Sequence, residues 1–154
     1  MNFDGWQIDD LSAHALLHRR PAVADLDNVQ MIHTYMANGG LVTGDEVARR
    51  LRPYREQPVS VIARWIVARQ VVCFTWRSET LVPLFQFDRS DMSLRPAVSE
   101  VLFELAGTLD DLELAQWFAR PNGWLENAEP VAVIEADQPA VVQAARADRY
   151  VAKG

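Results

Sequence analysis

The chain has 154 residues, of which 49% are hydrophobic, and it carries a formal net charge of −6. This length suits one domain or two small ones, and the composition is ordinary for a chain that buries a core. A single cysteine excludes an intrachain disulfide and a cysteine-based zinc site, and no apolar run approaches the ~20 residues that span a bilayer. Acidic residues precede the first arginine, which is the reverse of a signal peptide. We therefore expect a cytoplasmic protein that does not enter a membrane.

The charges are distributed unevenly along the chain. Residues 45–70 hold six basic side chains, all arginines, against three acidic ones, whereas residues 88–154 hold six basic and twelve acidic side chains. The overall charge argues against a protein that coats nucleic acid with its whole surface. One arginine-rich segment between acidic ones is still suited to phosphate and guanine, because the guanidinium offers forked donors.

The first third of the chain predicts helices. Apolar spacing indicates a helix near 10–19 and a second over about 22–38, which a Gly-Gly pair ends. Thr43, followed three residues later by Glu46, has the pattern of a capping box and predicts the start of a third helix.

The middle of the chain changes its hydrophobic period. A fourth helix is predicted over about 58–70, and two runs rich in β-branched and aromatic residues follow at 71–76 and 81–87. A polar turn separates these runs, which predicts a β-hairpin. Pro83 lacks an amide donor, so the second strand is expected to be an edge strand or to bend there.

The rest of the chain is again predicted to be helical. Pro96 suits the first position of a helix, and Asp110 is expected to begin another that stops before Pro121. A short helix near 130–136 and a last one near 139–150 follow, with the final residues beyond the helix end.

These patterns predict a mainly α protein, a helical bundle with a winged helix-turn-helix-like centre and one β-hairpin. The predicted organisation is an N-terminal helical region (1–42), a winged helix-turn-helix-like DNA-binding region (43–88) and a helical partner-binding domain (89–154). In such a centre the second helix of the pair enters the major groove and the hairpin touches the DNA backbone. A helical pair with a solvated basic face is the alternative. The candidate DNA-binding residues are Arg49, Arg50, Arg55, Ser60, Arg64, Arg69 and Arg77.

An ordered series of short motifs runs through the second half. Phe85-Gln86-Phe87-Asp88 follows Pro83, and Trp117, Pro121-Asn122, Leu125, Pro130 and the closing segment 141–146 come later. From Val71 onward this series resembles the Xre/MbcA/ParS-type toxin-binding antitoxin family, over about half of the chain. That family usually has a glycine-rich turn before the later proline, where this chain has Glu126-Asn127-Ala128-Glu129.

The resemblance implies a bacterial antitoxin. Members of the family neutralise a partner toxin, often a RES-domain enzyme that destroys NAD, and they commonly form homodimers and repress their own operon. The resemblance therefore implies a type II toxin-antitoxin system with a cognate toxin and operator DNA as partners. A stand-alone DNA-binding regulator without a toxin is the alternative. The candidate partner-binding residues are Trp117, Asn122, Trp124, Leu125, Arg149, Tyr150 and Lys153.

The same residues also have a purely structural interpretation. Pro121 cannot continue a helix, Asn122 can turn the chain through its own backbone, and the indole N–H of Trp117 needs an acceptor. Gln86 lies between two phenylalanines and must form hydrogen bonds if it is buried. Fixing an internal corner is about as probable for each residue as contacting a partner.

Catalysis finds little support in the sequence. His14 and His18 lie four residues apart, and with His33 they are the chain's three histidines, but no carboxylate frame for a metal accompanies the pair. Cys73 lies in an apolar run and is expected to be a small core residue rather than a nucleophile. We therefore expect no enzyme activity, no cofactor and no metal, with a small histidine-dependent enzyme as the remaining alternative.

Overall fold

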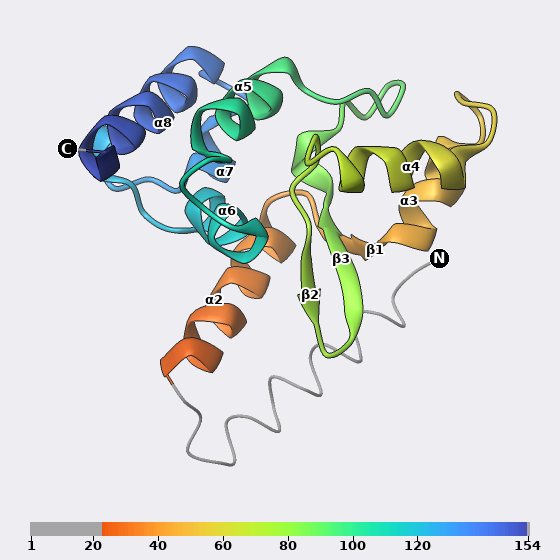
Figure 1. Ribbon diagram of the computed structural model, residues 1–154, viewed down its shortest axis with the longest axis horizontal. Coiled ribbons are helices and arrows are strands. Elements are labelled where there is room, and N and C mark those ends of the chain that lie inside the picture. Colours follow the sequence, from red (N-terminus) through yellow and green to blue (C-terminus); the bar gives the residue numbers. More distant parts are fainter. Residues whose placement is uncertain (1–22, 154) are drawn as a thin grey trace.

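The computed structural model describes residues 23–153, which form a mainly helical protein with a small antiparallel sheet (Figure 1). The predicted helix at 10–19, with His14 and His18, lies outside the described residues. None of the helices in the described part has the length and apolar character needed to cross a bilayer. The elements up to the sheet are α2 (Val23–Ala37), β1 (Leu41–Thr43), α3 (Gly44–Leu51), α4 (Pro58–Val67), β2 (Phe74–Trp76) and β3 (Glu79–Pro83).

The predicted helix boundaries in this half follow from local chemistry. Gly39 and Gly40 have φ angles of 105° and 103°, and the Gly40 N–H donates to the Tyr35 carbonyl, which ends α2. The Thr43 hydroxyl accepts from the Glu46 N–H at 3.3 Å and caps α3, as predicted. Helix α4 ends at Val67, before the predicted 70, because Arg69 adopts a left-handed φ of 54°.

The sheet differs from its prediction in two respects. Its strand order is β1-β3-β2, so a third strand, β1, pairs with β3 and makes β3 central rather than an edge. Pro83 is tolerated because it is the last residue of β3, paired with Leu41. Strands β2 and β3 pair antiparallel through Arg77 and Ser78, which both have positive φ, as a two-residue turn between such strands requires.

The predicted second strand is also shorter than expected. It ends at Pro83, and Leu84–Gln86 forms a 3₁₀ turn, η1. The Gln86 side chain is fully buried and accepts from the Val72 N–H at 2.7 Å, while its amide donates to the carbonyls of Val72 and Pro83. The expectation that a buried Gln86 needs hydrogen bonds is confirmed. These bonds connect the residues after β3 to the segment that precedes β2.

The second half contains α5 (Pro96–Leu105), α6 (Asp111–Ala119), the 3₁₀ turn η2 (Gly123–Leu125), α7 (Pro130–Val133) and α8 (Gln138–Lys153). Pro96 is the first residue of α5, and Asp110 caps α6 through a reciprocal capping box with Glu113, so both predicted starts are confirmed. The predicted end of the last helix near 150 is wrong, since α8 continues to Lys153.

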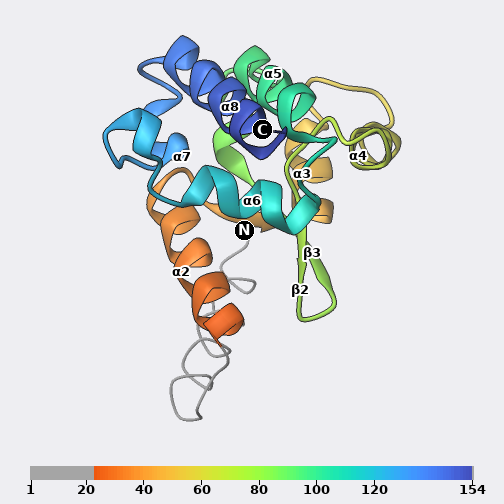
Figure 2. The same ribbon diagram turned by 60° about the vertical axis from the view of Figure 1, so that its left-hand side comes forward.

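The two faces of the sheet carry separate hydrophobic clusters. Leu41, Phe74 and Leu81 join a cluster with α2, α5, α6 and α8, whereas Val42 and Val82 join a second cluster with α3 and α4. Each cluster therefore draws on more than one of the three predicted segments. Figures 1 and 2 show α5 and α8 packed together at the end of the molecule opposite the β2–β3 turn.

Candidate functional site

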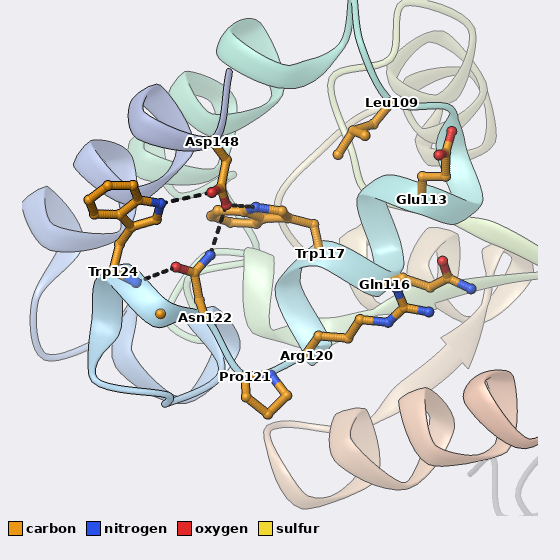
Figure 3. A pocket seen from close by; sticks show the side chains of 10 residues that line it. Leu109, Glu113, Gln116, Trp117, Arg120, Pro121, Asn122, Trp124 and Asp148 are labelled. Atoms are coloured by element: carbon orange, nitrogen blue, oxygen red, sulfur yellow. Dashed lines mark hydrogen bonds between the residues drawn. The ribbon is translucent and has the colours of Figure 1, made fainter. Parts of the chain in front are cut away.

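Three side chains of the C-terminal half donate hydrogen bonds to one carboxylate. Both oxygens of Asp148, on α8, accept hydrogen bonds: the Trp117 indole donates to Oδ2 at 2.7 Å, the Asn122 amide donates to Oδ2 at 3.0 Å, and the Trp124 indole donates to Oδ1 at 2.9 Å (Figure 3). We call these four residues the Asp148 corner. It joins the end of α6, the turn η2 and the last part of α8.

Local sequence chemistry builds the loop that reaches this corner. Pro121 stops α6, and the Asn122 side-chain oxygen accepts from the Trp124 N–H at 2.9 Å to start η2. Glu126 and Asn127 then adopt left-handed φ angles of 57° and 65°. The left-handed backbone is therefore present here without glycine.

A surface hollow of about 350 Å³ opens beside the corner. Trp124 is 59% exposed at its edge, and Arg120 pairs with Asp27 of α2 at 3.4 Å on the opposite side. The hollow is lined by Leu109, Glu113, Gln116, Trp117, Arg120, Pro121, Asn122, Gly123, Trp124 and Asp148 (Figure 3). It offers aromatic faces and charged groups, which suit side chains of another molecule.

The predicted partner-binding residues separate into structural and exposed groups. Leu125 is a buried core residue and is removed from the candidates, and the buried Asn122 is held by Asp148 and its own loop. Arg149 donates to Glu104 of α5 at 2.8 Å. Trp124, Tyr150 and Lys153 are the exposed ones, on η2 and the last turns of α8.

Asp148 itself was not among the candidate residues. The sequence does contain a signal for it, because two tryptophans and an asparagine supply three N–H groups that need an acceptor. Nothing local identifies that acceptor, since Asp148 lies 24 to 31 residues away from its donors.

The arginine-rich segment forms a second candidate surface. Arg64 and Ser60 are exposed on α4, Arg55 lies over the Trp65 ring at 5.8 Å, and Arg77 lies over the Trp76 ring at 5.5 Å in the β2–β3 turn. All three arginines are exposed, and Figure 2 shows the two elements that carry Arg64 and Arg77, α4 and the β2–β3 hairpin.

Three other arginines of the predicted set have internal ionic partners. Arg49 and Arg50 both bind the buried Glu46, at 2.6 and 2.9 Å. Arg69 donates to the Asp111 carboxylate and to the carbonyls of Ala106 and Leu109, which ties the end of α4 to the α5–α6 connection. Arg69 is therefore removed from the candidate DNA contacts.

Two features of the described residues bear on metal binding and on Cys73. They contain no group of three or more His, Cys, Asp or Glu side chains that could hold a metal. Cys73 is buried as predicted, and burial raises the pKa of its thiol to about 11, with Asp111 adding to the rise and Arg69 opposing it. A neutral buried thiol is a poor nucleophile.

Comparison of the chain with protein-family models, with curated proteins and with solved structures found no match.

Proposed function

We propose that this protein is a DNA-binding antitoxin of a type II toxin-antitoxin system. In this proposal residues 23–87 form a winged helix-turn-helix that binds operator DNA, and the C-terminal helices bind a cognate toxin. DNA binding is the function that the geometry supports best.

One observation carries the DNA-binding part. The chain order α2-β1-α3-α4-β2-β3, with strand order β1-β3-β2, is compatible with a winged helix-turn-helix and supports this part of the proposal. In the proposal α4 is the recognition helix and the β2–β3 turn is the wing. In this proposal the DNA-binding region, predicted at 43–88, also includes α2 and β1, because β1 supplies the third strand of its sheet.

The charge of this unit supports the same proposal. Arg52, Arg55, Arg64 and Arg77 are exposed and form no ion pair with any residue of 26–153. Exposed arginines without an ion pair suit the DNA backbone, where phosphate contacts release counterions and make affinity depend on salt.

Fluorescence anisotropy with a duplex from the region upstream of the gene tests DNA binding. We expect binding that weakens steeply with salt, and Arg55→Ala and Arg77→Ala are each expected to reduce the salt slope by about one. Arg120→Ala, which removes an exposed arginine from the C-terminal half, is the matched control and leaves the slope unchanged. Binding whose affinity does not depend on salt concentration, or no binding at low salt, contradicts the proposal.

A second observation supports toxin binding. Trp124 has its indole N–H fixed by Asp148 while 59% of the residue stays exposed beside the hollow. A large side chain held in one orientation loses little entropy on binding, and tryptophan is enriched among interface hot spots. The resemblance of the C-terminal half to the antitoxin family makes a toxin the proposed partner.

Co-purification and calorimetry with the protein encoded by the neighbouring gene test this part. Trp124→Ala is expected to weaken the complex by about 2 kcal/mol or more. Phe103→Ala, which removes an aromatic side chain that is 82% exposed on α5, is the matched control. If the neighbouring protein is harmless and unbound while DNA binding persists, the chain is a stand-alone transcriptional regulator. A homodimer is proposed for either case and is tested by sedimentation.

A further inference from the structure

The outward face of α4 has an unusual composition for a surface. Val59, Ala63 and Val67 lie four residues apart and form an exposed apolar ridge, with Val59 67% and Val67 84% exposed. Ser60 and Arg64 form a parallel exposed ridge beside it, also four residues apart. Residues at this spacing line one face of a helix. The face is therefore mostly apolar, with a single charge.

The proposed recognition helix would place this face against base edges. The apolar group that the major groove offers is the 5-methyl of thymine, and the group that suits arginine best is the O6/N7 edge of guanine. Eight residue steps along the apolar ridge cover about 12 Å, which matches three to four base pairs.

We infer that α4 selects a DNA site in which Arg64 binds a guanine and the apolar ridge contacts the methyl groups of neighbouring thymines. This inference rests on the proposed DNA-binding function and specifies what that function recognises.

Charge favours DNA over a second copy of the chain as the occupant of this face. A two-fold interface across α4 would bring Arg64 of each copy close to the same arginine of the other, and like charges there are costly. Arg52, Arg55 and Arg77 are also exposed in the same unit. A polyanion with apolar groups in its groove complements both the charge and the ridge.

Chemical changes to the DNA test the inference without altering the protein. The full chain is used to select duplexes from a library with a randomised 20-base-pair core, and the selected duplex is remade with modified bases. Deoxyuridine in place of thymidine lacks the 5-methyl group and is expected to weaken binding about fourfold for each contacted methyl. 7-Deazaguanine lacks the N7 acceptor and is expected to weaken binding about tenfold.

Two protein variants assign these effects to side chains. Val59→Ser/Val67→Ser is expected to bind the thymidine and deoxyuridine duplexes equally, and Arg64→Ala is expected to lose the discrimination against 7-deazaguanine. All three sites are exposed, so circular dichroism and Tm are expected to match the unmodified protein.

The results distinguish failure of this inference from failure of the proposed DNA-binding function on which it rests. Salt-dependent DNA binding with no preference for thymine methyls or guanine N7 overturns the inference and leaves the function standing. A valine variant that changes the oligomeric state but not the base preference also overturns it, because the ridge is then a protein interface. Failure to select any duplex at low salt overturns both.

Discussion

Two regions of the molecule use their charged side chains in opposite ways. On α4 and the β2–β3 turn, Arg64 and Arg77 face solvent without an ion pair in the described residues. In the C-terminal half, both oxygens of Asp148 and both of Glu104 are occupied by internal donors. The conspicuous motifs of the second half are therefore mainly structural. The side chains available for recognition lie beside them, and on a helix face without a conspicuous motif.

Removing the buried amide of Gln86 is expected to have the largest effect on stability. Gln86→Leu leaves the Val72 N–H and C=O buried without partners, and each unsatisfied group costs about 1–3 kcal/mol. We expect a loss of about 3 kcal/mol in the free energy of unfolding, measured by urea denaturation. Gln70→Leu, at an exposed position, is the control and is expected to change stability by less than about 0.5 kcal/mol. Equal effects from the two variants would show that the buried hydrogen bonds of Gln86 are not what matters.

Changing Asp148 is expected to cost somewhat less, because its corner is partly open to water. Asp148→Asn keeps the shape but turns one acceptor oxygen into a donor that faces the indole of either Trp117 or Trp124. We expect a loss of about 2 kcal/mol of stability and a shift in tryptophan fluorescence. Glu135→Gln, an exposed carboxylate on the α7–α8 connection, serves as the control. An unchanged fluorescence spectrum for Asp148→Asn would contradict the corner as a rigid support for Trp124.

Two arginines near the C-terminal end of α4, Arg64 and Arg69, provide a direct contrast between an exposed side chain and one held by internal bonds. Arg69→Ala removes the bonds to Ala106, Leu109 and Asp111 and is expected to lower stability by about 1 kcal/mol without changing DNA affinity. Arg64→Ala is expected to leave stability unchanged and to weaken DNA binding about tenfold. Denaturation and anisotropy on both variants test this. Reversed results would move the recognition surface from α4 to the interface between the halves.

Local chemistry made much of the fold predictable from the sequence. The start of α3 depends on Thr43, that of α6 on Asp110 and that of α5 on Pro96, and each acts within its own helical turn. Strand β1 was missed because its three residues, Leu41–Thr43, become a strand only by pairing with β3, about forty positions later. That distant pairing also makes β3 central, which no pattern around Pro83 indicates.

The candidate site was predictable to a different extent. The need of Trp117 for an acceptor and of Gln86 for hydrogen bonds follows from their chemistry, because polar groups taken out of water must be paired. The identity of the partners does not follow, because Asp148 lies on a helix that packs against the corner only in the folded chain. The exposure of Trp124 and the burial of Leu125, adjacent in sequence, likewise depend on that packing.

The smallest expected effect concerns Glu104. It is also the effect most specific to the C-terminal half. Hydrogen bonds from Arg149, and then from Arg146, hold the pKa of this carboxyl below its ordinary value of 4.5, although desolvation opposes the shift. A carboxyl with a lowered folded-state pKa stabilises the fold above its unfolded-state pKa, and this contribution is lost as the pH falls through the folded-state pKa. The Tm difference between the unmodified protein and Glu104→Gln is therefore expected to be constant near neutral pH and to shrink below pH 4.5. Glu100→Gln, on the exposed side of the same helix, is the control. A Glu104→Gln difference that persists in acid would mean that the side chain contributes through packing rather than through its charge, and the two halves would then differ less than their ion pairs indicate.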